Sequence, residues 1–160
     1  MNQYDLLIKN GKVRTAVDSF EAEIGVSEGK ITAIGQNLGK AERTIDAEGM
    51  LVLPGGIDAH CHIEQESSTR IMTADDFYSG SVSAAFGGNT TFLPFAAQHR
   101  GQSLREVVET ARERAQSKAV IDYGLHLIIS DPTQKVLEEE LPSLIKEGYT
   151  SFKVYMTYEM

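Results

Sequence analysis

The chain is poor in cysteine, in basic residues and in long apolar runs, and each shortage excludes a class of protein. One cysteine in 160 residues, Cys61, cannot build an internal disulfide framework. With 15 Lys and Arg against 23 Asp and Glu, the net charge of −8 disfavours a nucleic-acid partner, because binding phosphates requires clustered basic side chains. No apolar run approaches the roughly 18 residues of a membrane span, and the first residues lack a secretory pattern. We therefore expect a soluble, cytoplasmic protein with no nucleic-acid and no membrane partner.

What the chain does contain changes in character near Pro54. Residues 1–54 consist of short β-type stretches separated by turn signals, of which Asn10-Gly11 and the Ser-Glu-Gly-Lys segment at 27–30 are the clearest. We expect about five short antiparallel strands with hairpins at these turns. This part is therefore predicted to be a compact β unit.

From residue 55 onward, strand-like and helical segments alternate. Apolar runs at 50–62, 89–97, 120–130 and 150–158 are separated by helical segments at 73–88, 103–118 and 133–148. Thr73 is expected to cap the first of these helices and Ser103 the second, whereas Glu138 to Glu140 are typical of a solvated helix face. The alternation predicts βαβ units and a parallel sheet. Four units are half of a (β/α)8 barrel, but an open doubly wound sheet fits the periodicity equally well.

Polar side chains gather where the predicted strands end, which is where parallel α/β sheets collect reactive groups. His60 and His62 flank Cys61, so both imidazoles point to one side of the strand and can reach one metal ion. The same pair is compatible with two hydrogen-bonded histidines that hold no ligand. His126 lies in the middle of the third strand, which is typical of a core histidine, and His99 lies in a polar loop.

Lys153 lies within the apolar stretch "SFKVYM". Burying an unpaired ammonium is costly, so this lysine must reach polar surroundings, find an anion or lose its proton. One interpretation is a side chain that snorkels into a polar barrel mouth. Another is a neutral amine that takes up CO2 to form a carbamate, an anionic oxygen ligand able to bridge two metal ions.

Taken together, these motifs resemble the N-terminal part of the cyclic amidohydrolases, specifically the dihydropyrimidinase and hydantoinase group. The segments that carry the resemblance are "LLIKNGKV", "PGGIDAHCH", "TADDFYSGSVSAAFGGNTTFLPFAAQ", "VIDYGLHLIISDP" and "EGYTSFKVYMTYE". The combination of "GGIDAHCH" with "SFKVYMTY" at this separation is far more specific than His-x-His alone. The resemblance implies an α/β fold: the first half of a TIM (β/α)8 barrel, with four βα units, at 55–160. It also implies part of a small β-sandwich at 1–54.

The resemblance further implies a centre of two divalent metal ions, usually zinc. His60 and His62 match the ligands of one metal, and Lys153 matches the carboxylated lysine that bridges both. Tyr158 matches the tyrosine that stabilises the oxyanion. A hydroxide that bridges the metals would hydrolyse a cyclic amide or imide, such as a dihydropyrimidine or a hydantoin, to an N-carbamoyl amino acid.

The segments that contain Gln65 and Tyr155 match loops that shape the substrate pocket in hydantoinases. The loop "EQESSTRIM" is more polar than in many hydantoinases, which leaves room for a polar substrate. In this family two further metal-binding histidines and an aspartate come from later strands, so we expect this chain to be a fragment without hydrolytic activity alone. Relatives are commonly tetramers, which implies a homo-oligomer. The alternatives are an allantoinase-like or dihydroorotase-like enzyme and a non-catalytic dihydropyrimidinase-like scaffold protein, which would lack the metal ligands.

Overall fold

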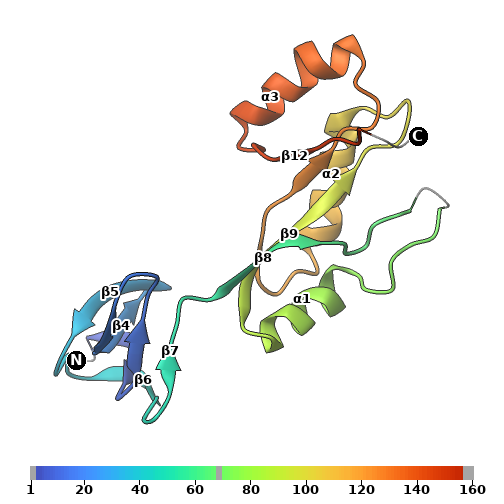
Figure 1. Ribbon diagram of the computed structural model, residues 1–160. Coiled ribbons are helices and arrows are strands. Elements are labelled where there is room, and N and C mark those ends of the chain that lie inside the picture. Colours follow the sequence, from blue (N-terminus) through green and yellow to red (C-terminus); the bar gives the residue numbers. More distant parts are fainter. Residues whose placement is uncertain (1–2, 68–69, 157–160) are drawn as a thin grey trace. The chain divides into compact units, whose positions relative to one another are not determined.

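The computed structural model of the 160-residue chain describes residues 3–67 and 70–156. The chain divides into two compact units, Met1–Pro54 and Gly55–Met160, and each is described by itself (Figure 1). None of the helices in the described part of the chain is long and apolar enough to cross a membrane.

The first unit contains two β-sheets. One sheet has the strand order β5-β4-β1-β6 and the other has the order β3-β2-β7. The strands are β1 (Tyr4–Lys9), β2 (Lys12–Arg14), β3 (Ser19–Glu21), β4 (Glu23–Ser27), β5 (Lys30–Gly35), β6 (Ala41–Asp46) and β7 (Leu51–Val52). The predicted hairpin between β4 and β5 is confirmed, because the two strands pair antiparallel around Glu28 and Gly29. These two residues have φ of 52° and 72°, as a type I′ turn requires.

The hairpin expected at Asn10-Gly11 is wrong, and so is the expectation of purely antiparallel strands in this unit. The flanking strands lie in different sheets: β1 pairs antiparallel with β4 and parallel with β6, while β2 pairs antiparallel with β3 and parallel with β7. Asn10 has a positive φ of 59°, and a Cβ at Gly11 would lie 2.5 Å from Val52 Cγ2. The Asn-Gly pair therefore carries the chain from one sheet to the other, with β7 packed closely against it.

The second unit alternates strands and helices, as predicted. Its strands are β8 (Gly56–Cys61), β9 (Asn89–Ala97), β10 (Asp122–Tyr123), β11 (His126–Ile128) and β12 (Phe152–Lys153). Its helices are α1 (Phe77–Phe86), α2 (Leu104–Gln116), a π-helical turn η1 (Val136–Glu140) and α3 (Leu141–Lys146). Every strand pair in this sheet is parallel.

The order of these strands decides between the two sheet types that the periodicity left open. The order is β8-β9-β11-β12, and β10 pairs with β9 just ahead of β11, so the strands follow their order in the chain without a reversal. A doubly wound sheet reverses its strand order at a switch point, whereas a barrel adds strands in sequence around a circle. The second unit is therefore a mixed α/β structure whose curled parallel sheet fits part of a (β/α)8 barrel (Figure 1).

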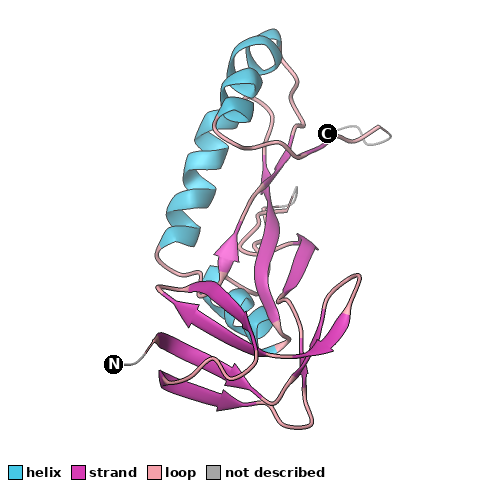
Figure 2. Cartoon of the chain, turned by 90° about the vertical axis from the view of Figure 1, so that its left-hand side faces the viewer, coloured by secondary structure: helices cyan, strands magenta, loops and turns pink. Residues whose placement is uncertain are grey.

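The core of this unit lies between the sheet and the helices, and Figure 2 shows α2 running alongside the strands. One buried cluster joins the apolar face of α2 to β9, β11 and the η1–α3 segment. Its members are Ala96, Leu104, Val107, Val108, Leu125, Leu127, Ile129, Val136 and Leu144. A second cluster consists of Ile63, Phe77, Phe92 and Ala115. The two clusters hold the strand ends in fixed positions against α1 and α2.

The N-termini of α1 and α2 test the two N-caps that the sequence predicts. Ser103 caps α2, as predicted, by accepting a hydrogen bond from the backbone N–H of Glu106. The prediction that Thr73 caps α1 is wrong, because α1 starts three residues later. Asp76 is the cap: its Oδ1 accepts from the Ser79 N–H at 2.8 Å, and its own N–H donates to Ser79 Oγ at 3.2 Å. This reciprocal pair is a capping box.

Glu140 corrects the prediction that residues 138–140 form a solvated face. Glu138 and Glu139 are exposed, but Glu140 is only 9% exposed. Its Oε2 accepts hydrogen bonds from the backbone N–H groups of Leu104 at 2.7 Å and Arg105 at 3.4 Å. The first N–H groups of a helix have no partner within the helix, so this carboxylate completes the start of α2 from the neighbouring segment.

Candidate metal centre

Strand β8 contains His60, ends one residue before His62 and has a β-bulge near its end. Between Asp58 and Cys61, β8 has one residue more than the segment 92–94 of β9 with which it pairs. The bulge contains Ala59 and His60, and the His60 N–H donates to Asp58 Oδ1 at 3.1 Å. Bulges bend a strand and re-aim its side chains, and they are frequent beside active sites. His60 therefore leaves the sheet in a direction that the regular pleat would not give.

His60 and His62 are both exposed, and their imidazoles lie next to one another. The ring centroids are 5.4 Å apart, with an angle of 70° between the planes. Both rings pack against the phenyl ring of Phe95 on β9, with centroid distances of 4.7 Å and 5.0 Å. The strand thus presents two imidazoles side by side above an aromatic ring.

Lys153 reaches the same phenyl ring from the last residue of β12. Its Nζ lies 4.6 Å from the ring centroid of Phe95 and 5.3 Å from that of Tyr155. Contacts of this length are favourable for an ammonium group, which the aromatic ring faces attract. The structure therefore brings His60, His62 and Lys153 together around Phe95, although the two strands are about 90 residues apart in the sequence.

Gln65 contacts the second histidine directly, since its Oε1 lies 2.6 Å from His62 Nδ1. Two hydrogen bonds hold the backbone of Gln65. Its N–H donates to Thr73 Oγ1 at 3.1 Å, and its carbonyl accepts from the Thr73 N–H at 3.0 Å. Thr73 therefore closes the loop that follows β8, instead of capping α1.

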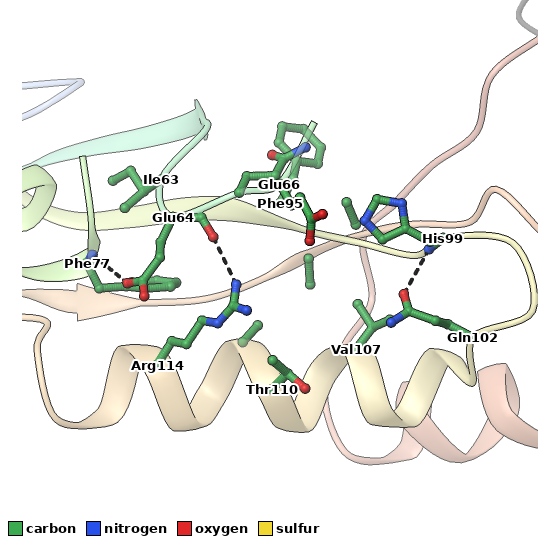
Figure 3. A pocket seen from close by; sticks show the side chains of 14 residues that line it. Ile63, Glu64, Glu66, Phe77, Phe95, His99, Gln102, Val107, Thr110 and Arg114 are labelled. Carbon is green, nitrogen blue, oxygen red and sulfur yellow. Dashed lines mark hydrogen bonds between the residues drawn. The ribbon is translucent and has the colours of Figure 1, made fainter. Parts of the chain in front are cut away.

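Glu64 fixes the base of this loop to both neighbouring helices (Figure 3). Its carboxylate accepts from Lys118 Nζ at 2.8 Å and 2.9 Å and from the Phe77 N–H at 3.1 Å, while its carbonyl accepts from Arg114 Nη1 at 3.1 Å. The hydrogen bonds that Lys118 donates to the Glu64 carboxylate raise the pKa of Lys118 above its ordinary value, and Asp76 adds to this effect. The segment next to His62 is thus anchored at α1 and α2.

A cavity of about 100 Å³ lies between the loop, β9 and α2 (Figure 3). Gln65, Glu66, Thr110 and His99 are among the residues that line it, but His60, His62 and Lys153 are not. The backbone N–H of His99 donates to Gln102 Oε1 at 3.0 Å. This cavity lies beside α2 and β9, and it shares Gln65 and Phe95 with the surroundings of the paired imidazoles, although none of the three candidate ligands lines it.

A network of hydrogen bonds around Gln98, which follows β9, joins the end of this strand to the residues after β11. Gln98 is 2% exposed, and its Oε1 accepts from the N–H groups of Ser130 at 3.2 Å and Asp131 at 3.1 Å. Its Nε2 donates to the carbonyl of Gln102 at 2.8 Å. The Ser130 hydroxyl also donates to the Gln98 carbonyl. These hydrogen bonds hold the ends of β9 and β11 together.

His126 is half-buried and not fully in the core, but both of its ring nitrogens have hydrogen-bond partners. Its Nε2 lies 2.8 Å from the carbonyl oxygen of Ala59, and its Nδ1 lies 2.5 Å from Ser151 Oγ. Because a carbonyl can only accept, the ring donates through Nε2 and accepts the serine proton at Nδ1. The carbonyl that it satisfies belongs to the bulge beside His60, so His126 helps to hold that bulge.

Among the described residues, the strand ends bring two imidazoles and one lysine side chain together as candidate metal ligands. Among residues 3–67 and 70–156, no cluster of three or more His, Cys, Asp or Glu side chains could hold a metal ion. Burial raises the pKa of Cys61 to about 11, with a further contribution from Asp58, so this thiol stays protonated at neutral pH. Two imidazole nitrogens and a carbamate oxygen would form a donor set of the kind that zinc accepts. Tyr158 lies outside the described residues.

Sequence reasoning did not identify Phe95 as part of this site. An aromatic residue in a buried strand is typical of a core position, and Phe95 is buried. Its contact with both histidines and Lys153 depends on the pairing of β9 with β8 and β11, which no local pattern encodes. The role of Glu64 was missed for the same reason, because its partners Lys118 and Arg114 lie about 50 residues away.

The chain is similar to known hydantoinases over nearly its whole length. It is 49% identical over 155 residues to D-hydantoinase of Geobacillus stearothermophilus, covering 96% of this chain and 32% of that protein. It is 37% identical over 163 residues to dihydropyrimidinase of Rattus norvegicus, covering 98% of this chain and 31% of that protein. A solved structure of D-hydantoinase superposes with a TM-score of 0.92 at 50% identity, covering 97% of this chain and 34% of that one.

No protein-family profile matches the chain. The resemblance that the motifs indicated is nevertheless confirmed by these relatives in both sequence and fold. The chain is homologous to the D-hydantoinases and dihydropyrimidinases, and it spans about one third of the length of those that it matches.

Proposed function

We propose that this chain supplies part of the active site of a metal-dependent hydrolase that opens cyclic amides such as dihydropyrimidines and hydantoins to N-carbamoyl amino acids. The observation that carries the proposal is the meeting of His60, His62 and Lys153 around Phe95. That arrangement occurs in a chain about half identical to D-hydantoinases. In this proposal residues 55–160 are the first four βα units of a TIM barrel, and residues 1–54 are part of a β-sandwich.

The proposed ligands are His60 and His62 for one metal, with a carbamate on Lys153 as the bridge to a second. Imidazole nitrogen and carboxylate-type oxygen are both common zinc ligands, which supports zinc as the metal. Divalent metals bound here would supply hydroxide at neutral pH and polarise the ring carbonyl. In this proposal the neutral amine of Lys153 reacts with CO2 to form the carbamate.

The remaining proposed residues bind and orient the substrate. The Tyr158 hydroxyl would donate a hydrogen bond to the carbonyl oxygen as negative charge develops on it. Tyr155 and Gln65 would line the substrate pocket, and Phe95 would exclude water from one side of the paired imidazoles. The leaving ring nitrogen must gain a proton when the amide bond breaks. We also propose a homo-oligomeric assembly, as the sequence resemblance implies.

The test combines metal content with turnover of dihydrouracil, hydantoin and allantoin. The protein is purified without chelator and with bicarbonate, and metal per chain is measured by elemental mass spectrometry. Bound zinc that is lost in His60→Asn but retained in His99→Asn supports the proposed ligands, since both variants carry the same chemical change. Turnover of allantoin alone would indicate an allantoinase. Because this chain alone is expected to lack hydrolytic activity, the refuting result is the metal content: a folded chain that binds no zinc would refute the proposed ligands and favour a scaffold.

A further inference from the structure

We propose that Gln65 is a positioning residue that selects the tautomer of His62 and thereby keeps one nitrogen of this ring available to a metal ion. Together with the backbone ties of the loop, this would make metal affinity depend on the loop that follows β8. This inference rests on the proposed function only in taking the species that binds His62 to be a metal ion. Its structural part concerns residues of this chain alone.

The contact between the two side chains determines which nitrogen carries the proton. Gln65 Oε1 lies 2.6 Å from His62 Nδ1, and an amide oxygen can only accept a hydrogen bond. Nδ1 must therefore be the protonated nitrogen of the neutral ring, which leaves the lone pair of Nε2 free. A neutral imidazole has only one such lone pair, so the partner of one nitrogen decides whether the other can bind a metal.

The opposite orientation of the amide would have the opposite consequence. The Gln65 NH2 group would then donate to Nδ1, and the ring proton would lie on Nε2. In that tautomer Nε2 could not act as a ligand without first losing its proton. The two orientations therefore predict opposite tautomers for His62, and this makes the inference measurable in the metal-free protein.

The loop holds Gln65 in place through its backbone. Two hydrogen bonds join Gln65 to Thr73, and the preceding residue, Glu64, is anchored by Lys118 and Arg114. A glutamine on an unrestrained loop would lose backbone entropy as well as side-chain entropy in making the same contact. Here the anchored backbone limits that cost, so the amide is presented to His62 before any metal arrives.

His60 provides an internal comparison. Within the described part of the chain its ring packs against Phe95 and His62, and no hydrogen bond to a glutamine or carboxylate fixes its tautomer. We therefore expect two different histidines in the metal-free protein: His62 in one tautomer and His60 in a mixture. Only His62 should respond to a change at Gln65.

The first arm of the test is nitrogen-15 NMR of the histidine side chains in the metal-free 160-residue chain, at about pH 9, where an ordinary imidazole is neutral. The wild-type chain should show His62 protonated at Nδ1. Gln65→Met should give a tautomer mixture, whereas Gln65→Glu, which also accepts a hydrogen bond, should restore the Nδ1 proton. Gln134→Met, the same change at an exposed helix-start residue, should leave the spectrum unchanged.

The second arm is zinc affinity, measured by competition with a chelator. Loss of a partner that orients a metal-binding histidine typically weakens metal affinity about 10- to 100-fold, and we expect this for Gln65→Met. Gln65→Glu should bind zinc at least as tightly as the wild-type chain. A wild-type His62 protonated at Nε2, or a Gln65→Met variant with unchanged tautomer and affinity, would overturn the inference. A wild-type chain with the expected tautomer that binds no zinc would instead refute the proposed function.

Discussion

The buried carboxylate of Glu140 offers the sharpest test of how the second unit is held together. It comes from the η1 segment and accepts hydrogen bonds from two backbone N–H groups at the start of α2, those of Leu104 and Arg105. Replacing it by glutamine, Glu140→Gln, preserves the shape and one acceptor oxygen but removes the charge. The variant therefore isolates the electrostatic part of this contact.

The expected loss follows from the difference between charged and neutral hydrogen bonds. A hydrogen bond to a charged group contributes about 1.5–3 kcal/mol and a neutral one about 0.5–1.5 kcal/mol, so Glu140→Gln should lower the free energy of unfolding by about 1–2 kcal/mol at neutral pH. The negative charge near the positive helix start adds to this effect. Lys135 lies 3.5 Å from Glu140 but is 68% exposed, and such a pair contributes little.

The effect must also depend on pH in a definite direction. Burial by itself raises the pKa of the Glu140 carboxyl, but the hydrogen bonds from Leu104 and Arg105, together with Ser103 and Lys135, outweigh it and hold the pKa below its ordinary value. Because the pKa is lower in the folded than in the unfolded chain, the stabilisation is fully present above the unfolded value of about 4.3. It is lost as the pH falls through the lower folded value.

Urea unfolding followed by circular dichroism at several pH values measures this contribution. The difference between the wild-type chain and Glu140→Gln should be largest near neutral pH and should shrink as the medium becomes acidic. Glu139→Gln removes the same charge from an exposed neighbour and should change the stability little at any pH. Equal losses in the two variants, or a loss that does not vary with pH, would refute the role assigned to Glu140.

Three further substitutions test the core, a turn and the bulge, with unfolding free energy as the measurement. Phe92→Ala should cost about 3–5 kcal/mol, because Phe92 is fully buried and a cavity would remain, and a loss below about 1 kcal/mol would contradict its core position. Gly88→Ala should cost about 1 kcal/mol through strain alone, since Gly88 has φ of 86° and open space around its Cα. His126→Leu should cost about 0.5–1.5 kcal/mol by removing its hydrogen bond to the solvent-exposed Ala59 carbonyl, whereas His99→Leu should cost less.

The alternation of elements in the second unit could be predicted from the sequence because periodicity and caps are local. The strand at 89–97 was predicted with its exact bounds, and Ser103 was correctly assigned as the cap of α2. The error at Thr73 arose because Thr73 and Asp76 are both good caps; in the structure Asp76 pairs with Ser79 in a capping box, and Thr73 binds the backbone of Gln65 instead. The family could be identified from motifs, since residues of the required types recur at specific separations.

The sequence by itself determined the change of architecture near Pro54, the β4–β5 hairpin and the presence of two imidazoles next to the end of β8. These features depend on neighbours within a few residues. Only the tertiary structure decided that β1 and β2 lie in different sheets and that the parallel strands follow one another without reversal. It also decided that Phe95 lies beneath both histidines and Lys153. The physical reason is that the choice of a pairing partner is made by burial and hydrogen bonding between segments far apart in the chain, and a local pattern cannot express that choice.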